Sequence, residues 1–182
     1  MRIVVSGTHA SGKSTLISDF RLRHPEFALM PDPFELVDEA GDVAHVVLFG
    51  SQLRIAADRL RDDATEDVIA ERGPVDFLAY LLALEDLGGR GLDRDALARA
   101  VTLTREAMAG VDLLVVLPLS ARDGIAVGED EHLELREAMD EQLLDLVDDR
   151  DVVGDRLLVA EITGPPEVRL ARLEEAARTR RG

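Results

Sequence analysis

The stretch MRIVVSGTHASGKSTL, residues 1–16, decides the fold. Its apolar run 2–6 is typical of a buried β-strand; a turn follows, and a helical pattern begins at Gly12. Gly7, Gly12, Lys13 and Ser14 satisfy the pattern G-x-x-x-x-G-K-[ST] in this strand–turn–helix setting. A chance match in a chain of this length has a probability of about 1%, and the setting lowers it further.

Each residue type in this pattern has a role in binding a nucleoside triphosphate. Glycines let the backbone form a concave nest of N–H groups, and the following helix adds its positive N-terminal end. Lys13 would reach the β- and γ-phosphates, and the Ser14 hydroxyl would join the Mg²⁺ shell. The sequence therefore predicts an ATP site with Mg²⁺ as cofactor, in which His9 contributes backbone rather than its imidazole. The expected nucleotide-binding residues of this loop are Gly7, His9, Ala10, Ser11, Gly12, Lys13, Ser14 and Thr15.

Lys13 is also the only lysine of the chain. The other 20 of the 21 Lys and Arg residues are arginine. A lysine-poor genome explains the arginines, but it does not explain why the remaining lysine directly follows Gly12. Its position indicates a need for a compact, flexible ammonium group that a planar guanidinium cannot replace.

Length and composition indicate one globular domain spanning residues 1–182. Hydrophobic residues make up 46% and charged residues 32% of the chain, as in folded proteins without a membrane span. There is no cysteine, hence no disulfide framework or thiolate metal site. The apolar runs are too short to cross a membrane, and the N-terminal run is too short for a signal peptide. A cytoplasmic protein is expected.

The formal net charge of −16 limits the choice of partners. Binding a nucleic-acid backbone or an anionic membrane requires an extended basic surface, so neither partner is expected. An anionic ligand must instead be held by a local pocket that overrides an unfavourable overall field.

Short β-type runs alternate with longer helical patterns along the whole chain. This alternation predicts a three-layer α/β domain of the P-loop NTPase type, with a mostly parallel five-stranded sheet flanked by helices. In the helical stretch 36–63, the spacing puts Val46, Val47, Leu53 and Ala57 on one side. The expected strands cover residues 2–6, 26–30, 67–70, 111–119 and 156–162. The expected helices cover residues 12–23, 36–63, 73–87, 91–110, 131–149 and 165–180.

The residues after the third expected strand distinguish between classes of nucleotide-binding protein. A GTPase would need an Asn-Lys-x-Asp guanine reader, and the chain has no asparagine and no second lysine. An AAA-type or transporter ATPase would place an acidic residue after its long apolar strand, but residues 115–120 read VVLPLS. The short strand DVIA runs directly into Glu71 and Arg72 instead, which indicates a small-molecule kinase.

The segment DVIAERGPVDFLAY, residues 67–80, resembles the acidic-Arg signature of deoxynucleoside and thymidylate kinases. It is still more similar to the small nicotinamide-riboside-kinase-like P-loop ATPases, and the resemblance extends to the element order of nearly the whole chain. It implies that Glu71 holds Mg²⁺, directly or through water. It implies that Arg72 binds the acceptor, with a structural ion pair as the alternative. Asp32 would take the acceptor hydroxyl's proton, unless it only shapes the proline turn PDP.

The same resemblance implies further acceptor-site residues. Phe49, Gln52 and Arg54 lie where related kinases hold the acceptor, although each could simply belong to a helix core or surface. Asp76 and Tyr80 match the family pattern, and each could equally be a helix-cap or core residue. The acceptor-binding set is therefore Asp32, Phe49, Gln52, Arg54, Arg72 and Asp76.

Two later segments complete the expected site. Residues 119–136 lie where the related kinases carry a mobile lid, but here the segment is acidic and Arg122 and Arg136 are its only Lys or Arg residues. Arg122 is the expected catalytic cation of this lid, beside Lys13. Thr163 and Gly164 lie where relatives wrap backbone around adenine, or they form an ordinary strand–helix turn.

The resemblance implies a kinase that transfers the γ-phosphate of Mg·ATP to a hydroxyl of a nucleoside or similar metabolite. Two alternatives stay open: a nucleoside-monophosphate kinase, and a regulatory ATPase that has no acceptor. Related kinases are often dimers, so a homodimer is compatible with the resemblance.

Overall fold

The computed structural model describes residues 1–36, 45–62, 65–88, 92–119 and 133–182. The expected catalytic residue Arg122 and most of the expected lid, 119–136, lie outside these ranges. The strands are β1 (Arg2–Ser6), β2 (Ala28–Met30), β3 (Val68–Glu71), β4 (Leu113–Val116) and β5 (Leu158–Glu161). The helices are α1 (Lys13–Arg23), the 3₁₀ turn η1 (Pro33–Leu36), α2 (His45–Asp62), α3 (Pro74–Asp86), α4 (Arg94–Met108), α5 (Leu133–Asp148), α6 (Arg150–Val153) and α7 (Pro166–Arg181).

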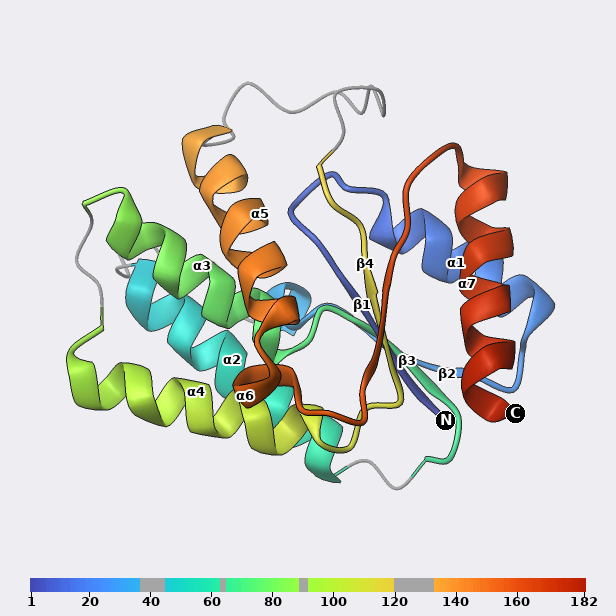
Figure 1. Cartoon of the computed structure of the whole chain (residues 1–182), viewed down its shortest axis with the longest axis horizontal. Helices are drawn as coiled ribbons and strands as arrows, with labels where there is room; N and C mark the ends of the chain where they lie inside the picture. The colour runs from blue at the N-terminus through green and yellow to red at the C-terminus, as the bar shows by residue number, and fades with distance from the viewer. Residues whose placement is uncertain (37–44, 63–64, 89–91, 120–132) are drawn as a thin grey trace.

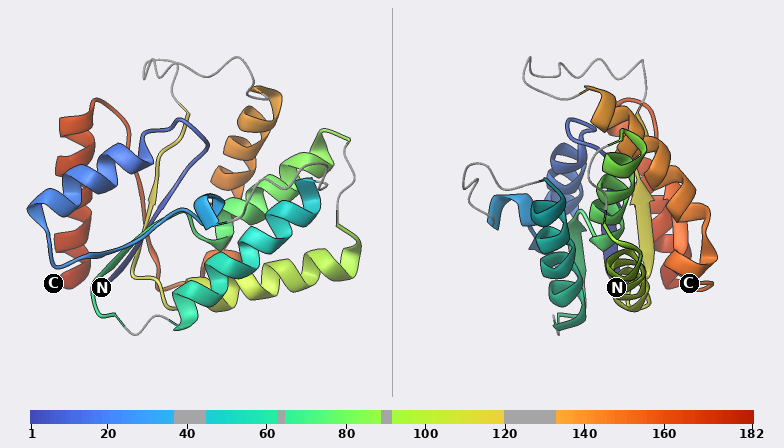
Figure 2. Two further views of the ribbon diagram at one scale, coloured as in Figure 1. Left: turned by 180° about the vertical axis from the view of Figure 1, so that it is seen from behind. Right: turned by 90° about the vertical axis from the view of Figure 1, so that its left-hand side faces the viewer.

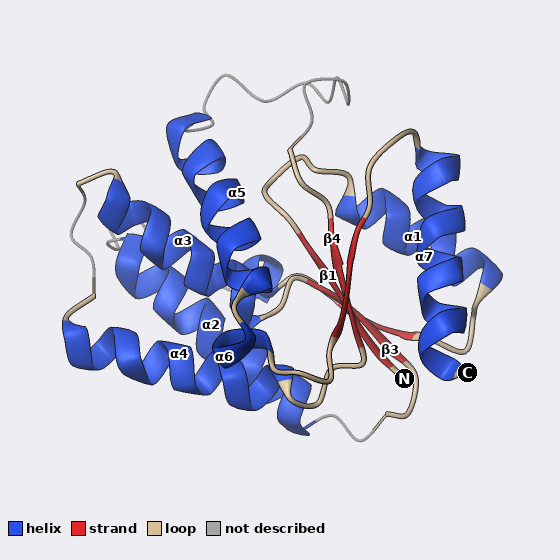
Figure 3. Cartoon of the chain, in the orientation of Figure 1, coloured by secondary structure: helices blue, strands red, loops and turns tan. Residues whose placement is uncertain are grey.

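The five strands form one parallel sheet in the order β2-β3-β1-β4-β5. The expected α/β class is thus confirmed, and every described strand is parallel. Parallel strands place all their carboxyl ends at one edge of the sheet, as Figure 3 shows. Because the chain leaves β1 toward β2 on one side and later returns to β4 on the other, the end of β1 is where such folds bind ligands.

Helices cover both faces of the sheet (Figure 1). α1 and α7 pack on one face, and α2 to α5 lie on the other, an arrangement that the two views of Figure 2 repeat. The central strands are apolar on both sides for this reason. In β4, Leu113 and Val115 join the cluster under α1 and α7, whereas Leu114 and Val116 join the larger cluster on the opposite face.

The buried side of α2 agrees with the expected one except at one residue. Leu53 and Ala57 are buried as the spacing predicts, whereas Val47 is 57% exposed. Phe49 and Gln52 are also buried on this helix. An aromatic ring and an amide thus face the interior, where they become available to the site described below.

No described helix is both long enough and apolar enough to cross a membrane.

Truncating the core at β4 should destabilise the protein strongly. Leu114 is fully buried in the larger cluster, so Leu114→Ala should lower the free energy of unfolding by about 2–5 kcal/mol. Leu22→Ala is the matched control, because Leu22 is 81% exposed and its truncation should change the same quantity by less than about 0.5 kcal/mol. Urea unfolding of both variants measures the difference. A similar cost for the two would contradict this assignment of the core.

Candidate active site

The loop between β1 and α1 is shaped by two glycines in conformations that other residues adopt poorly. Gly12 has a φ of 90°, in the left-handed region, immediately before α1 begins. Gly7 has a φ of 150°, and a Cβ there would lie 2.8 Å from both the Leu117 carbonyl oxygen and Ser11 Oγ. The loop therefore passes too close to β4 and to itself for a side chain at Gly7.

A buried carboxylate fixes the start of this loop. Asp76, in the first turn of α3, is fully buried and accepts three hydrogen bonds. The donors are Ser6 Oγ at 2.6 Å, the Gly7 amide at 2.9 Å and the Gly73 amide at 2.8 Å. Burial raises the pKa of Asp76, while Ser6, the Arg72 guanidinium and the two amides oppose that rise. Asp76 thus lies behind the loop and caps α3, and it does not line the cavity in front.

Lys13 is folded back onto the loop that it follows. Its Nζ donates to the Thr8 carbonyl at 2.6 Å and lies 3.4 Å from Ser11 Oγ, and the residue is 4% exposed. Burial, and next the nearby Arg72 guanidinium, lower the pKa of Lys13 to about 7; the carboxylates of Asp76, Glu71 and Asp32 oppose this. The loop therefore contains an ammonium group that is close to losing its proton.

Ser14 and Glu71 bring two oxygen ligands together beside the loop. The Ser14 hydroxyl, in the first turn of α1, donates to Glu71 Oε1 at the end of β3 over 2.7 Å. Hydroxyl and carboxylate oxygens are hard ligands that suit Mg²⁺, which takes its remaining ligands from phosphates and water. The described residues contain no cluster of three or more His, Cys, Asp or Glu that would hold a metal without such help. The pair fits a metal that arrives with a nucleotide.

Arg72 and Asp32 form an ion pair at the centre of the cavity. Arg72 NH1 lies 3.2 Å from Asp32 Oδ2, and the Arg72 side chain is 3% exposed. Arg72 has a φ of 60°, an unusual conformation for a residue with a side chain, and its amide donates to the Val5 carbonyl at 3.0 Å. The other Asp32 oxygen accepts from the Phe34 amide at 3.0 Å. The carboxylate is therefore held by the backbone on one side and by a cation on the other.

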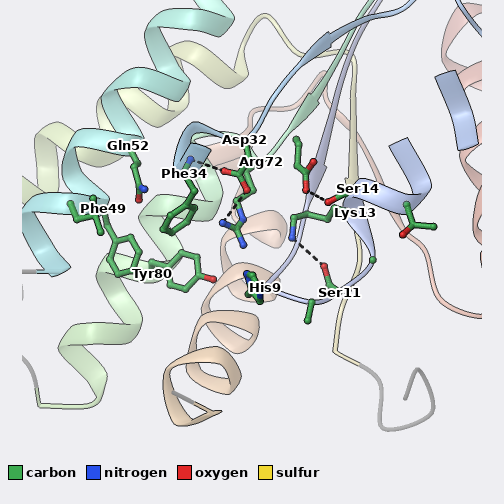
Figure 4. Close-up of a pocket in the computed structure, with 15 residues that line it drawn as sticks. His9, Ser11, Lys13, Ser14, Asp32, Phe34, Phe49, Gln52, Arg72 and Tyr80 are labelled. Atoms are coloured by element: carbon green, nitrogen blue, oxygen red, sulfur yellow. Dashed lines mark hydrogen bonds and ion pairs between the residues drawn. The ribbon is translucent and has the colours of Figure 1, made fainter. Parts of the chain in front are cut away.

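Aromatic rings and one amide form the wall beyond this pair (Figure 4). Phe49 and Tyr80 are stacked, with ring centroids 4.6 Å apart, and the Arg72 guanidinium lies 4.7 Å from the centroid of Phe34. Gln52 is fully buried, and neither its amide nitrogen nor its amide oxygen has a hydrogen-bond partner among the described residues. The same holds for Arg72 Nε. Buried polar atoms without a partner are costly, so a ligand that supplies both a donor and an acceptor fits this wall.

The cavity between loop and wall has a volume of about 790 Å³. It brings together most of the residues singled out by the sequence, whereas Gly7 and Asp76 lie outside its lining. Arg54 is exposed on α2 and does not line it, and Thr163 and Gly164 belong to the β5–α7 turn instead. The lining residues are His9, Ala10, Ser11, Gly12, Lys13, Ser14, Thr15, Asp32, Phe34, Leu48, Phe49, Gln52, Glu71, Arg72 and Tyr80.

Several contacts around the loop were not expected from the sequence. Arg136 Nε donates to the His9 carbonyl at 3.0 Å, and the Tyr80 hydroxyl accepts from the His9 amide. Arg59 NH1 donates to the Pro31 carbonyl at 2.8 Å, next to Asp32. Arg136 could have been found as one of the two lid cations. Arg59 gave no signal, since it follows no motif and reaches 28 residues back along the chain.

The chain matches no family model. No curated protein matches it either.

Solved structures do match, over nearly the whole chain. One is deoxyadenosine kinase from M. mycoides with bound dATP, at 16% identity and a TM-score of 0.68, covering 98% of this chain and 100% of that one. Another is thymidylate kinase from Candida albicans, at 18% identity and a TM-score of 0.69, covering 99% and 92%. NadR in complex with NR matches at 16% identity and a TM-score of 0.67; 98% of this chain corresponds to 50% of that chain. The chain therefore has the fold of P-loop nucleoside and nucleotide kinases.

Proposed function

We propose that this protein is a Mg·ATP-dependent kinase that transfers the γ-phosphate to a hydroxyl of a nucleoside-like acceptor. One observation carries the proposal: the Asp32–Arg72 pair shares a cavity with Lys13 and the loop between β1 and α1. A site that only hydrolysed ATP would not need the aromatic wall and the amide of Gln52 beyond that pair. The known nucleoside and nucleotide kinases of the same fold add support.

Each residue has a defined task in this reaction. Lys13 releases Thr8 and binds the β- and γ-phosphates, while the backbone amides of the loop hold the remaining phosphate oxygens. Asp32 accepts a hydrogen bond from the acceptor hydroxyl and takes its proton as the new O–P bond forms. The bond between the γ-phosphorus and the β–γ bridging oxygen breaks at the same time, and ADP leaves. Ser14 and Glu71 would hold Mg²⁺, which would neutralise part of the charge on the transferred phosphate. Arg136 and the expected lid cation Arg122 would add positive charge over that phosphate.

The charge of the cavity favours an acceptor that carries no phosphate. Lys13 and Arg72 are the only Lys or Arg side chains among the described residues that line it, and Arg72 is already paired with Asp32. A nucleoside monophosphate would need further cations for its own phosphate. The stacked rings of Phe49 and Tyr80 and the unpaired amide of Gln52 suit a planar heterocycle with a polar edge. A nucleoside meets these requirements.

On the donor side, Thr163 and Gly164 would contact the adenine of ATP.

A direct assay tests the proposal. The protein is incubated with ATP, Mg²⁺ and a panel of nucleosides, nucleoside monophosphates and sugars, and ADP formation is measured. We expect at least one nucleoside to raise ADP formation well above the rate without acceptor. A monophosphate as the best acceptor would support the nucleoside-monophosphate kinase. Hydrolysis that no acceptor stimulates would support the regulatory ATPase and contradict the proposal.

Removing the carboxylate of Asp32 should abolish transfer while leaving donor binding intact. Asp32→Asn keeps an oxygen that can accept from the Phe34 amide, so the turn should fold normally. The expected loss in kcat is roughly 100-fold or more, the usual contribution of a positioned general base. The dissociation constant of ADP should stay within about twofold. Asp58→Asn, at an exposed position of α2, is the matched control and should retain full activity. An active Asp32→Asn variant would exclude this role.

Nucleotide binding should take up a proton at Lys13. The pKa of Lys13 is about 7 in the empty site, so at about pH 8.5 the amine is mostly neutral. Bound phosphates favour the charged form and raise that pKa, so ADP affinity should fall as pH rises above about 7, by up to roughly tenfold per unit. Calorimetry at about pH 8.5 in buffers of different ionisation enthalpy should report uptake of close to one proton. Lys13→Met should abolish the uptake; unchanged uptake in that variant would assign the proton to another group.

A further inference from the structure

Arg169 is a buried cation that joins two segments far apart in the sequence. It lies in the first turn of α7 and is 6% exposed. Its NH1 donates to the Ser11 carbonyl at 2.7 Å, and its Nε donates to the Gly164 carbonyl at 2.6 Å. A planar guanidinium carries donors on separate nitrogens in a rigid fork, so it spans two oxygens in a geometry that a single ammonium nitrogen does not reproduce. One side chain therefore sets the spacing between the loop that joins β1 to α1 and the turn that joins β5 to α7.

Helix stability would not select a cation at this position. The N-terminal turn of a helix carries partial positive charge, and burial removes the hydration of a guanidinium. The last turn of the same helix, where a cation is favourable, carries Arg178, Arg180 and Arg181. Arg169 is thus placed against the helix dipole and away from water, which indicates that its two carbonyl contacts serve the site.

Of the two joined segments, the loop lines the cavity and the β5–α7 turn does not. Ser11 belongs to the loop, and its hydroxyl is 3.4 Å from Lys13 Nζ. Gly164 has a φ of 107° in a turn whose neighbour Thr163 is exposed, and neither residue lines the acceptor cavity. Because the attacking and leaving oxygens of phosphoryl transfer lie roughly in line, the nucleoside part of the donor extends away from the acceptor. The exposed β5–α7 turn, held against the loop by Arg169, is available to receive that part.

We infer that Arg169 is a positioning residue for the donor nucleotide. By holding the Ser11 and Gly164 carbonyls together, it makes the phosphate loop and the β5–α7 turn one rigid surface for both halves of the donor. The inference rests on the proposed function in one respect, that the donor is a nucleoside triphosphate. The guanidinium bonds Ser11 of the loop and Gly164 of the turn, and neither of these partners belongs to the aromatic wall or to the Asp32–Arg72 pair, so acceptor binding should not depend on Arg169.

Conservative variants on one helix test the inference. Arg169→Lys keeps the charge but cannot bridge both carbonyls, so the dissociation constant of ADP should rise roughly tenfold or more. The KM of the best acceptor should stay within about twofold. Arg172→Lys is the matched control, because exposed Arg172 bonds the Thr163 carbonyl at 3.2 Å and is not seen to contact the loop. Its ADP dissociation constant should change less than about twofold. Calorimetry measures ADP binding without any need for turnover.

Chemical rescue separates positioning from a loss of stability. Added guanidinium ion at millimolar concentration should restore much of the ADP affinity of Arg169→Ala, and it should not improve Arg172→Ala. Normal ADP binding by Arg169→Lys would overturn the inference, even if that variant melted at a lower temperature. A parallel rise in the acceptor KM would overturn it too, because the damage would then be general. If the wild-type protein did not bind ADP, that result would contradict the proposed function. The role of Arg169 is tested separately, by comparing ADP binding of the variants with that of a wild-type protein that does bind ADP.

Discussion

The buried carboxylate of Asp76 holds the two chain segments on which the site depends. It binds the last residue of β1, the first residue of the loop and the N-terminal amide before α3. Those contacts fix where the loop begins and where the residues that follow β3 can lie. Burial disfavours the charged carboxylate, and three donors within 2.9 Å are the compensation. A polar group in this position adds little to the core, but it orients both sides of the cavity at once.

The parallel sheet then places the chemistry on neighbouring strand ends. β1 and β3 pair so that Val5 lies opposite Glu71, which brings the loop after β1 beside the residues after β3. Arg72 follows in a left-handed conformation, and its side chain points into the cavity, where it meets Asp32 from the end of β2. Strand register therefore assembles an oxygen pair for a metal, an ion pair and a lysine from segments that are distant in the sequence.

The sequence predicted the elements well because their signals are local. The glycine pattern of residues 7–14 and the apolar strands require no knowledge of the partner segments, and the sheet confirms them. The placement of Val47 on the inner side of α2 was wrong because a run such as HVVLFG is apolar on several sides, and packing against α3 and α4 decides which residues are buried. The pattern at Asp76 allowed either an acceptor contact or a helix cap, and only the packed structure shows that its carboxylate caps α3 behind the loop. Arg169 carries no motif, because its partners are backbone carbonyls of any residue type.

The single lysine differs from the buried arginines in what happens to its charge when the site is empty. Arg72 and Arg169 retain their charge under all ordinary conditions, so each can serve as a permanent structural contact, to a carboxylate and to two carbonyls. Lys13 can lose its proton near neutrality, so the empty loop avoids a third fixed charge in one small buried region. An arriving phosphate restores that charge where it is needed. Because the chain has a net charge of −16, the attraction for an anion has to come from local groups such as Lys13. The charge of Lys13 in turn depends on whether the ligand is bound. An arginine at position 13 would repel Arg72 permanently, which is a physical reason for a lysine at this one position.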